Sequence, residues 1–176
     1  MKVGTKLAKI KSTLDIPLKR ATLCFLVKET QVLLAMKKRG FAQGKWNGVG
    51  GKMDDKDKNI EETAIRETNE EIQVNPTSLK QVAVLNFFHL GKTDNNQQVT
   101  VYLTSKWEGE PTESEEMAPR WFKINEIPYD EMWEDDRFWL PKVLSGETVE
   151  ADFLFNKNQV LLEHEIQVTR PAVDIF

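Results

Sequence analysis

The segment from Trp46 to Val74 reads WNGVGGKMDDKDKNIEETAIRETNEEIQV and joins a glycine-containing loop to an acidic stretch. Within it, Asn59 is a good helix N-cap, and Glu62 three residues later completes a capping-box pattern. Small or apolar side chains then recur every four residues, at Ile60, Ala64, Thr68 and Ile72. This periodicity predicts a helix from Asn59 to about Gln73, with a weakly apolar inner face.

The same helix would carry three carboxylates on one face, because Glu67, Glu70 and Glu71 stand at i, i+3 and i+4. Three like charges this close repel one another unless a cation lies against them. Mg²⁺ prefers oxygen ligands and leaves several coordination positions to water and phosphate. A solvated acidic helix face is the alternative interpretation.

Three glycines precede this helix, at Gly48, Gly50 and Gly51. A loop of this composition allows backbone carbonyls and amides to approach an ion or a phosphate closely. Because the loop and the acidic face occur together, we favour a metal-dependent site over a solvated surface.

Apolar runs on both sides of this segment predict strands. Residues 21–27 and 32–36 form a hairpin pattern of largely buried strands. Further strands are predicted at 81–88, 98–104, 119–124, 151–156 and 160–168, with a second helix over 135–144. Strands on both sides of helices indicate an α/β fold, an α/β/α sandwich with a mixed central sheet.

The bulk properties fit one globular domain, since the chain has 176 residues, 40% of them hydrophobic. A formal net charge of −4 argues against a nucleic-acid polymer as partner. No apolar stretch approaches the ~18 residues that a membrane span requires. The single cysteine, Cys24, lies in an apolar run, which predicts a buried structural thiol and a reducing compartment such as the cytoplasm.

The N-terminal segment is basic, and Pro17 interrupts any helix in it. We predict a partly ordered extension over residues 1–19 that can be flexible, followed by a single domain over residues 20–176. The extension carries one acid, Asp15, and five lysines, and Arg20 follows directly after it. The lysines are Lys2, Lys6, Lys9, Lys11 and Lys19.

The loop and acidic helix together resemble the Nudix box, in which a glycine is followed by the motif Arg-Glu-x-x-Glu-Glu. Gly51 would be the opening glycine, and the sequence Arg66-Glu67-Thr68-Asn69-Glu70-Glu71 would be the motif. Gly51 and Arg66 are one residue further apart than in the family pattern, which suggests an insertion in the loop 53–58. Asp57 is the nearest substitute for the first acidic residue of the box.

Segments outside the box resemble the MutT-related members of the Nudix family that act on oxidised purine nucleoside triphosphates. They are residues 36–41, residues 113–117, and residues 127–141 with the pattern Trp133-Glu134-Asp135-Asp136. The resemblance implies that a divalent cation, Mg²⁺ with Mn²⁺ as a substitute, binds to six residues: Gly50, Gly51, Glu67, Glu70, Glu71 and Glu116. The four glutamates would also be the catalytic residues.

The resemblance further implies a base pocket, whose predicted chemistry fits the residue types. Trp133 can stack on a purine, and Asn47 can make paired hydrogen bonds to a base edge. If both Asp135 and Asp136 enter the pocket, burial and repulsion should raise at least one pKa. The complete set of predicted substrate-binding residues is Thr22, Lys37, Phe41, Asn47, Phe87, Trp133, Asp135 and Asp136.

The expected activity is therefore Mg²⁺-dependent hydrolysis of a small-molecule oxidised purine nucleoside triphosphate to the monophosphate and pyrophosphate, by a monomer. Two alternatives remain open: a Nudix hydrolase for another nucleoside diphosphate-linked substrate, and a catalytically weak nucleotide-binding module. Trp133 could instead be a core aromatic, and Asp135 a simple helix cap. His89 and His164 lack ligand-like spacing and are interpreted as structural or surface residues.

Overall fold

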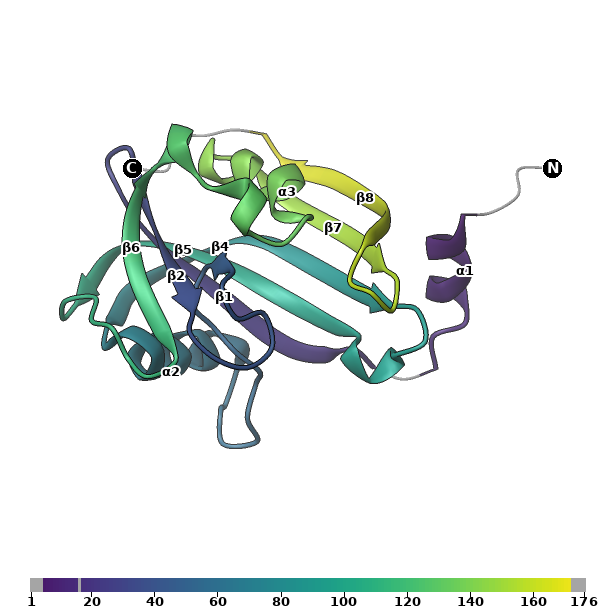
Figure 1. Cartoon of the computed structure of the whole chain (residues 1–176), viewed down its shortest axis with the longest axis horizontal. Helices are drawn as coiled ribbons and strands as arrows, with labels where there is room; N and C mark the ends of the chain where they lie inside the picture. Colours follow the sequence, from purple (N-terminus) through teal and green to yellow (C-terminus); the bar gives the residue numbers. More distant parts are fainter. Residues whose placement is uncertain (1–4, 16, 172–176) are drawn as a thin grey trace.

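The computed structural model describes residues 5–15 and 17–171, and its centre is a mixed sheet (Figure 1). The strand order is β3-β2-β1-β5-β4-β7-β8, and β6 pairs with β2. β1 with β5 and β4 with β7 are parallel pairs, whereas the other pairs are antiparallel. The strands are β1 (Lys19–Lys28), β2 (Gln31–Lys37), β3 (Trp46–Asn47), β4 (Asn75–His89), β5 (Gln97–Glu108), β6 (Met117–Lys123), β7 (Thr148–Phe155) and β8 (Leu161–Arg170).

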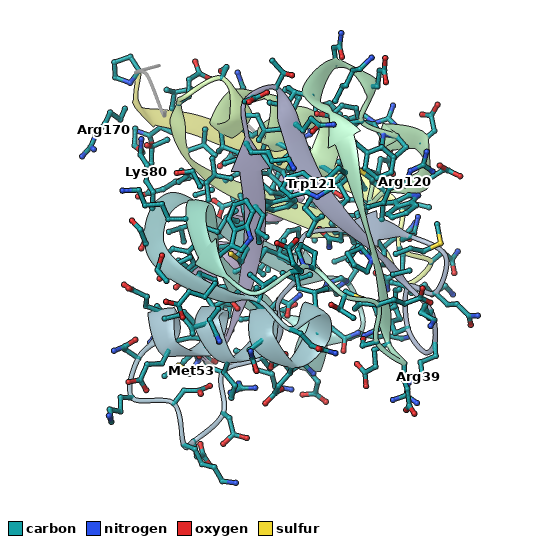
Figure 2. The ribbon with its side chains drawn as sticks, turned by 90° about the vertical axis from the view of Figure 1, so that its left-hand side faces the viewer. Arg39, Met53, Lys80, Arg120, Trp121 and Arg170 are labelled. Atoms are coloured by element: carbon teal, nitrogen blue, oxygen red, sulfur yellow. The ribbon has the colours of Figure 1, made fainter. Side chains whose placement is uncertain are left out.

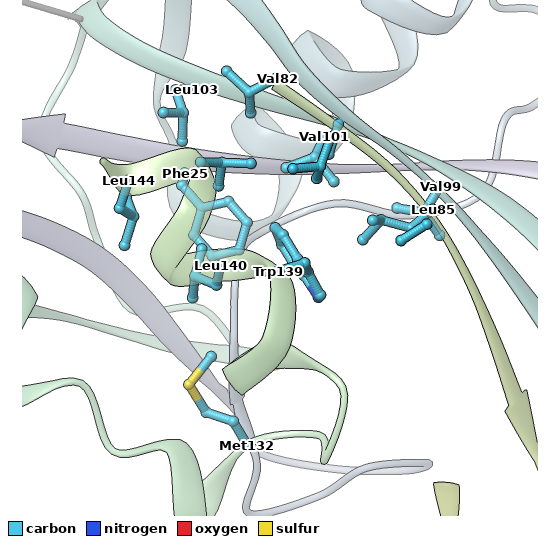
Figure 3. Close-up of a cluster of buried hydrophobic side chains, with 14 of the residues drawn as sticks. Phe25, Val82, Leu85, Val99, Val101, Leu103, Met132, Trp139, Leu140 and Leu144 are labelled. Atoms are coloured by element: carbon cyan, nitrogen blue, oxygen red, sulfur yellow. The ribbon is translucent and has the colours of Figure 1, made fainter. Parts of the chain in front are cut away.

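Two helices cover opposite faces of this sheet, α2 (Ile60–Ile72) and α3 (Asp136–Leu144). Side chains of β1 alternate between the two cores, since Phe25 packs with Trp139 of α3 while Leu26 packs with Ala64 of α2. The ring centroids of Phe25 and Trp139 are 6.0 Å apart in an edge-to-face arrangement (Figure 3). The predicted α/β/α arrangement around a mixed sheet is confirmed.

Helix α2 begins and ends as its sequence predicts. Asn59 Oδ1 accepts a hydrogen bond from the Glu62 backbone N–H at 2.9 Å, and Gln73 closes the helix in the left-handed conformation with φ of 60°. The carboxylate of Glu62 accepts from the backbone N–H of Lys58 instead of that of Asn59. The predicted capping box is therefore only half formed.

The hairpin of β1 and β2 is confirmed, with Val27 opposite Val32. β4 begins six residues earlier than predicted and β5 continues four residues further, because their ends pair with each other from Asn75 opposite Glu108 onwards. β3, only two residues long, was not predicted. Cys24 is fully buried, and burial raises the pKa of its thiol to about 12, so its interpretation as a structural residue is confirmed.

Helix α1 (Lys6–Ser12) lies within the predicted N-terminal extension and packs at one end of the sheet (Figure 1). The Glu163 carboxylate of β8 accepts hydrogen bonds from the backbone N–H groups of Lys6 and Leu7, and buried Leu7 packs against Phe88 and Leu154. Residues 1–4 and 16 of the extension, like residues 172–176, lie outside the described residues. Among the helices that the structure describes, none combines the length and the apolar character that crossing a bilayer requires.

Candidate active site

A pocket of about 330 Å³ brings the four predicted glutamates together. Helix α2 supplies three of these glutamates, Glu67, Glu70 and Glu71, and the segment leading into β6 supplies Glu116. Arg39 lies at the rim of the pocket, where β2 ends and β6 begins (Figure 2). The lining residues are Arg39, Glu67, Glu70, Glu71, Ser114, Glu115 and Glu116.

Arg66 lies among the helix carboxylates as their counter-ion. Its Nη1 is 2.8 Å from Glu67 Oε1 and 3.2 Å from Glu70 Oε2. Its Nε and Nη2 donate to the two oxygens of Asp57 at 2.9 and 2.8 Å, and this pairing holds the pKa of Asp57 well below its usual range. Asp57, the nearest substitute for the first acidic residue of the box, therefore contacts the arginine of the motif.

The loop carrying the predicted insertion projects away from the sheet beyond Met53 (Figure 2). It closes on itself, because the Asp57 N–H donates to the Asp54 carbonyl at 3.0 Å and the Asp54 N–H donates to Asp57 Oδ2 at 2.9 Å. The tight turn keeps Asp57 in reach of Arg66 despite the extra residue.

Glu71 is the most buried of the four glutamates, with an exposed fraction of 7%. Its Oε2 accepts a hydrogen bond from the Gly50 N–H at 3.0 Å. Burial nevertheless raises the pKa of Glu71 to about 7, and burial likewise raises that of Glu67. The hydrogen bond from Arg39 acts in the opposite direction on Glu116 and lowers its pKa. A cation in this pocket would stabilise the ionised forms of Glu67 and Glu71.

The glycine loop fits closely between β1 and α2. A Cβ on Gly51 would lie 2.4 Å from the carboxyl carbon of Glu67, and a Cβ on Gly50 would lie 2.0 Å from the backbone oxygen of Thr22. The Thr22 N–H donates to the Gly51 carbonyl at 2.9 Å, which fixes the loop to β1. Only glycine therefore lets Glu67 approach the loop backbone this closely.

These observations test whether the site fits a divalent metal ion. The donor set consists of carboxylate oxygens with a backbone carbonyl nearby, which suits Mg²⁺. Within residues 5–15 and 17–171, no three acidic, histidine or cysteine side chains are already gathered tightly enough to hold an ion. Arg66 occupies Glu67 and Glu70, so binding a metal requires those carboxylates to turn from the guanidinium. The residues present fit the ion after that rearrangement.

We expect the substitution of alanine for glycine to have different effects at Gly50 and at Gly51, because their neighbours differ. Gly50→Ala would push a Cβ into rigid backbone and should lower the melting temperature by several degrees, as overpacking by about 1–3 kcal/mol does. Gly51→Ala meets only the end of the Glu67 side chain, so we expect nearly unchanged stability but a large loss of metal-dependent activity. Thermal unfolding and turnover of both variants check this. Equal stability losses in the two would contradict the assigned geometry.

A second, larger pocket of about 530 Å³ lies over the α3 face of the sheet. Gly50 and Gly51 line this pocket, and the same two glycines contact Glu71 and Glu67 of the glutamate pocket, so the glycine loop lies between the two pockets. Lys37 does not line the larger pocket and lies instead with Nζ 3.8 Å from Glu116 Oε2. The other predicted substrate-binding residues all line it: Thr22, Phe41, Asn47, Phe87, Trp133, Asp135 and Asp136.

Trp133 is a pocket aromatic and not a core residue, because it is only partly buried. Phe41, which is 71% exposed, lies beside it with ring centroids 5.5 Å apart, and Lys45 Nζ is 5.2 Å from the ring centre. The core tryptophan of this region is Trp139, which is fully buried. Trp133 and Phe41 together offer flat apolar surface to a ligand.

Asp135 and Asp136 are both buried, with exposed fractions of 3% and 2%. Asp135 Oδ2 accepts from Trp139 Nε1 at 3.0 Å, and Asp136 Oδ2 accepts from the Trp133 backbone N–H at 3.1 Å. Burial raises the pKa of Asp135 to about 6, and burial with the charge of Asp135 raises that of Asp136 well above its usual value. Burial thus favours the protonated form of both carboxyls, and a protonated carboxyl donates a hydrogen bond whereas an ionised one accepts.

Asp135 stands at the N-cap position of α3 but makes no capping hydrogen bond with its side chain. The alternative that Asp135 is a simple helix cap is therefore wrong. Asn47 also faces this pocket, and its Oδ1 accepts from the Gly48 N–H at 2.8 Å.

Sequence reasoning missed several residues that line the larger pocket. Period-two alternation in β4 could have placed His89 on the same face as Phe87. Nothing in the sequence could have placed Gln97, which is opposite Phe87 in the β5 register, or Phe155, which is opposite His89 in β7. These contacts depend on long-range strand pairing.

Comparison with known proteins agrees with this site. The family model described as the NUDIX domain matches residues 17–143. The chain is 40% identical over 148 residues to a zebrafish (Danio rerio) protein named oxidized purine nucleoside triphosphate hydrolase, covering 84% of this chain and 94% of the relative. A mouse (Mus musculus) protein of the same name is 36% identical over 146 residues, covering 83% and 92%.

Solved structures show the same architecture. The crystal structure of a MutT protein from Bacillus halodurans superposes with a TM-score of 0.75 at 27% identity, covering 85% of this chain and 98% of the other. The match to the domain model spans both the glycine loop with its acidic helix and the Trp133 segment. By sequence, fold and the contents of its two pockets, the chain belongs to the Nudix family.

Proposed function

We propose that the chain hydrolyses oxidised purine (deoxy)nucleoside triphosphates, of the 8-oxo-dGTP or 2-hydroxy-dATP kind, to the monophosphate and pyrophosphate. The observation that carries this is the buried pair Asp135 and Asp136 in an aromatic pocket that adjoins the glutamate pocket. The names of the zebrafish and mouse relatives support the same substrate class. The biological role would be to remove damaged nucleotides from the pool before they enter DNA.

The phosphate end of the substrate would lie at the glutamate pocket. We propose that Glu67, Glu70, Glu71 and Glu116, with a backbone carbonyl of Gly50 or Gly51, hold Mg²⁺, and that Mn²⁺ can replace it. When bound, the ion supplies charge neutralisation for the phosphates and a lowered pKa for a coordinated water. One of the glutamates takes the proton of the attacking water, and Asp57 holds the guanidinium of Arg66 beside the helix.

The base would lie in the larger pocket. Trp133 provides a stacking surface, a contact worth roughly 1–3 kcal/mol per base, and Phe41 and Phe87 form the other apolar walls. Asn47 and the aspartate pair would hydrogen-bond to the base edge.

The nucleoside side would be contacted by Thr22 and Lys37. Lys37 lies outside the larger pocket but beside Glu116, so it can reach a sugar or phosphate oxygen between the two pockets.

The aspartate pair also explains why altered purines suit this pocket. A protonated Asp donates a hydrogen bond and an ionised Asp accepts one. We propose that the pair holds one proton, which can sit on either aspartate, so that it matches donor–acceptor patterns that oxidation creates on a purine. We further propose that the protein acts as a monomer in the cytoplasm, for which size-exclusion chromatography and imaging of the tagged protein are direct checks.

Pyrophosphate release with Mg²⁺ tests the proposal. The comparison uses kcat/KM for 8-oxo-dGTP, 2-hydroxy-dATP, dGTP, dATP and ADP-ribose. We expect a preference of at least about tenfold for the oxidised purines, which corresponds to about 1.4 kcal/mol. Activity without that preference would indicate a Nudix hydrolase of another substrate. Inactivity on the whole panel, with the fold intact, would support the binding-module alternative.

A further inference from the structure

His89 occupies a place in the larger pocket that the proposed mechanism does not use. It lies two residues after Phe87 on β4, on the same face of the strand, and lines the pocket with it. Its ring stacks on Phe155 with centroids 5.7 Å apart and an interplanar angle of 19°. Phe155 is in turn 6.3 Å from Phe87, so the three rings form one aromatic wall. His89 was interpreted from the sequence as a structural or surface residue, and the structure places it in the pocket lining.

The two ring nitrogens of His89 have different surroundings. Nδ1 is buried and has no hydrogen-bond partner among the residues that the structure describes. Nε2 is not among the buried unpaired atoms, none of the described residues hydrogen-bonds to it, and His89 lines the larger pocket. The ring thus has one nitrogen that no ligand can reach and one that a ligand can.

This asymmetry selects a protonation state. A doubly protonated ring, or a neutral ring with its proton on Nδ1, would bury an unpaired N–H donor, which native structures rarely contain. The neutral ring with its proton on Nε2 buries only an unpaired acceptor. Burial and the nearby charge of Lys92 lower the pKa of His89, which also favours the neutral ring. His89 accordingly presents an N–H donor to the pocket.

We propose that His89 is a specificity-determining residue that donates a hydrogen bond from Nε2 to an acceptor oxygen on the purine base. The inference rests on the proposed function, since it requires the larger pocket to hold a base. The base is the expected recipient because His89 continues the aromatic wall of Phe87 and Phe155. The phosphates are expected in the glutamate pocket, and His89 does not line that pocket.

Side-chain nitrogen NMR tests the tautomer without any activity measurement. The chain has only two histidines, so long-range ¹H–¹⁵N spectra of the full-length protein contain two imidazole patterns, and an H164F variant identifies that of His89. We expect the Nε2–H pattern for His89 at pH 7, and a change at Nε2 when metal-free protein binds 8-oxo-dGMP. An Nδ1–H or doubly protonated pattern would overturn the proposal.

Binding of nucleoside monophosphates tests the hydrogen bond itself. Isothermal titration calorimetry without metal would measure the Kd of 8-oxo-dGMP, 2-hydroxy-dAMP and dAMP, of which only the first two carry a base oxygen. His89→Phe keeps the stacking on Phe155 and removes the donor. It should weaken binding of the first two about three- to tenfold, the effect of one neutral hydrogen bond, and leave dAMP unchanged. His89→Gln keeps an N–H donor and should recover part of the loss.

His164→Phe is the matched control, because His164 also stacks on a phenylalanine, Phe138 at 4.3 Å, but is exposed and does not line the pocket. It should leave all three Kd values unchanged. Equal weakening of all three nucleotides by His89→Phe, or none, would overturn the assigned contact while leaving the proposed function intact. Failure of the wild-type protein to bind any of the nucleotides would instead contradict the proposed function.

Discussion

Replacing Glu71 with glutamine should lower kcat by about 10²–10⁴-fold, the range for loss of a positioned proton acceptor. Glutamine keeps the size of the side chain and an oxygen that accepts from the Gly50 N–H. It cannot ionise, so it offers a metal ion only a neutral oxygen in place of a carboxylate. Steady-state pyrophosphate release with Mg²⁺ measures the effect. The expected loss is in kcat, because Glu71 lies in the phosphate-side pocket and not in the base pocket.

The same variant should be more stable than the wild type in the absence of metal at pH 8. The fold raises the pKa of Glu71 from 4.5 to about 7, so ionising it opposes folding. This destabilisation is absent below pH 4.5, grows as the pH rises from 4.5 to 7, and is complete above 7. Thermal unfolding in a chelator should therefore show a higher Tm for Glu71→Gln at pH 8 and equal Tm values at pH 4.

Glu61→Gln is the appropriate control, because Glu61 is exposed in the first turn of the same helix and lies outside both pockets. It should retain wild-type turnover and Tm. A Glu71→Gln variant with near wild-type turnover would refute the metal site on α2.

Substituting Asp135 or Asp136 with asparagine should reduce the preference for oxidised purines over dGTP by roughly 10- to 100-fold, as loss of a charged hydrogen bond of about 1.5–3 kcal/mol does. Each variant replaces one carboxyl with an amide, whose donor and acceptor atoms are fixed and do not depend on a proton. The ratio of kcat/KM for 8-oxo-dGTP and 2-hydroxy-dATP to that for dGTP measures this. The kcat/KM values for the two oxidised substrates should fall by different factors, because each variant displays a single hydrogen-bonding pattern.

Mg²⁺ affinity should stay unchanged in both variants, since the aspartates line only the larger pocket. Asp130→Asn is a matched control on the same segment, where the side chain is 96% exposed and pairs with Arg137. If Asp135→Asn and Asp136→Asn both kept the wild-type ranking of substrates, the aspartate pair could not determine the base specificity.

The acidic helix was predictable because its capping and periodicity are local. Asn59 and Gln73 determine where α2 begins and ends within its own sequence. Helix α1 was not predictable, because its seven residues depend on Glu163, more than 150 positions away, for hydrogen bonds at its N-terminus. A helix this short is marginal without such tertiary contacts. The early start of β4 was hidden by Pro76, since proline is unfavourable in strands.

The candidate site divides in the same way. Helical spacing alone brings Glu67, Glu70 and Glu71 to one face, whereas Glu116 and the base-pocket residues were suggested only by resemblance. The raised pKa values of Asp135 and Asp136 follow from burial, which no short segment encodes. The position of His89 in the larger pocket was not predictable, because its partner Phe155 joins it only through the parallel pairing of β4 and β7.

Arg66 gives the acidic helix a built-in counter-ion through Asp57, Glu67 and Glu70. The negative charge of this helix is therefore partly neutralised within the fold itself. An incoming ion has to compete with a guanidinium already in place, so loading is an exchange and not a simple addition. Weak or monovalent ions such as Na⁺ and K⁺ should lose that competition, and the arginine thereby acts as a filter for ions of high charge density.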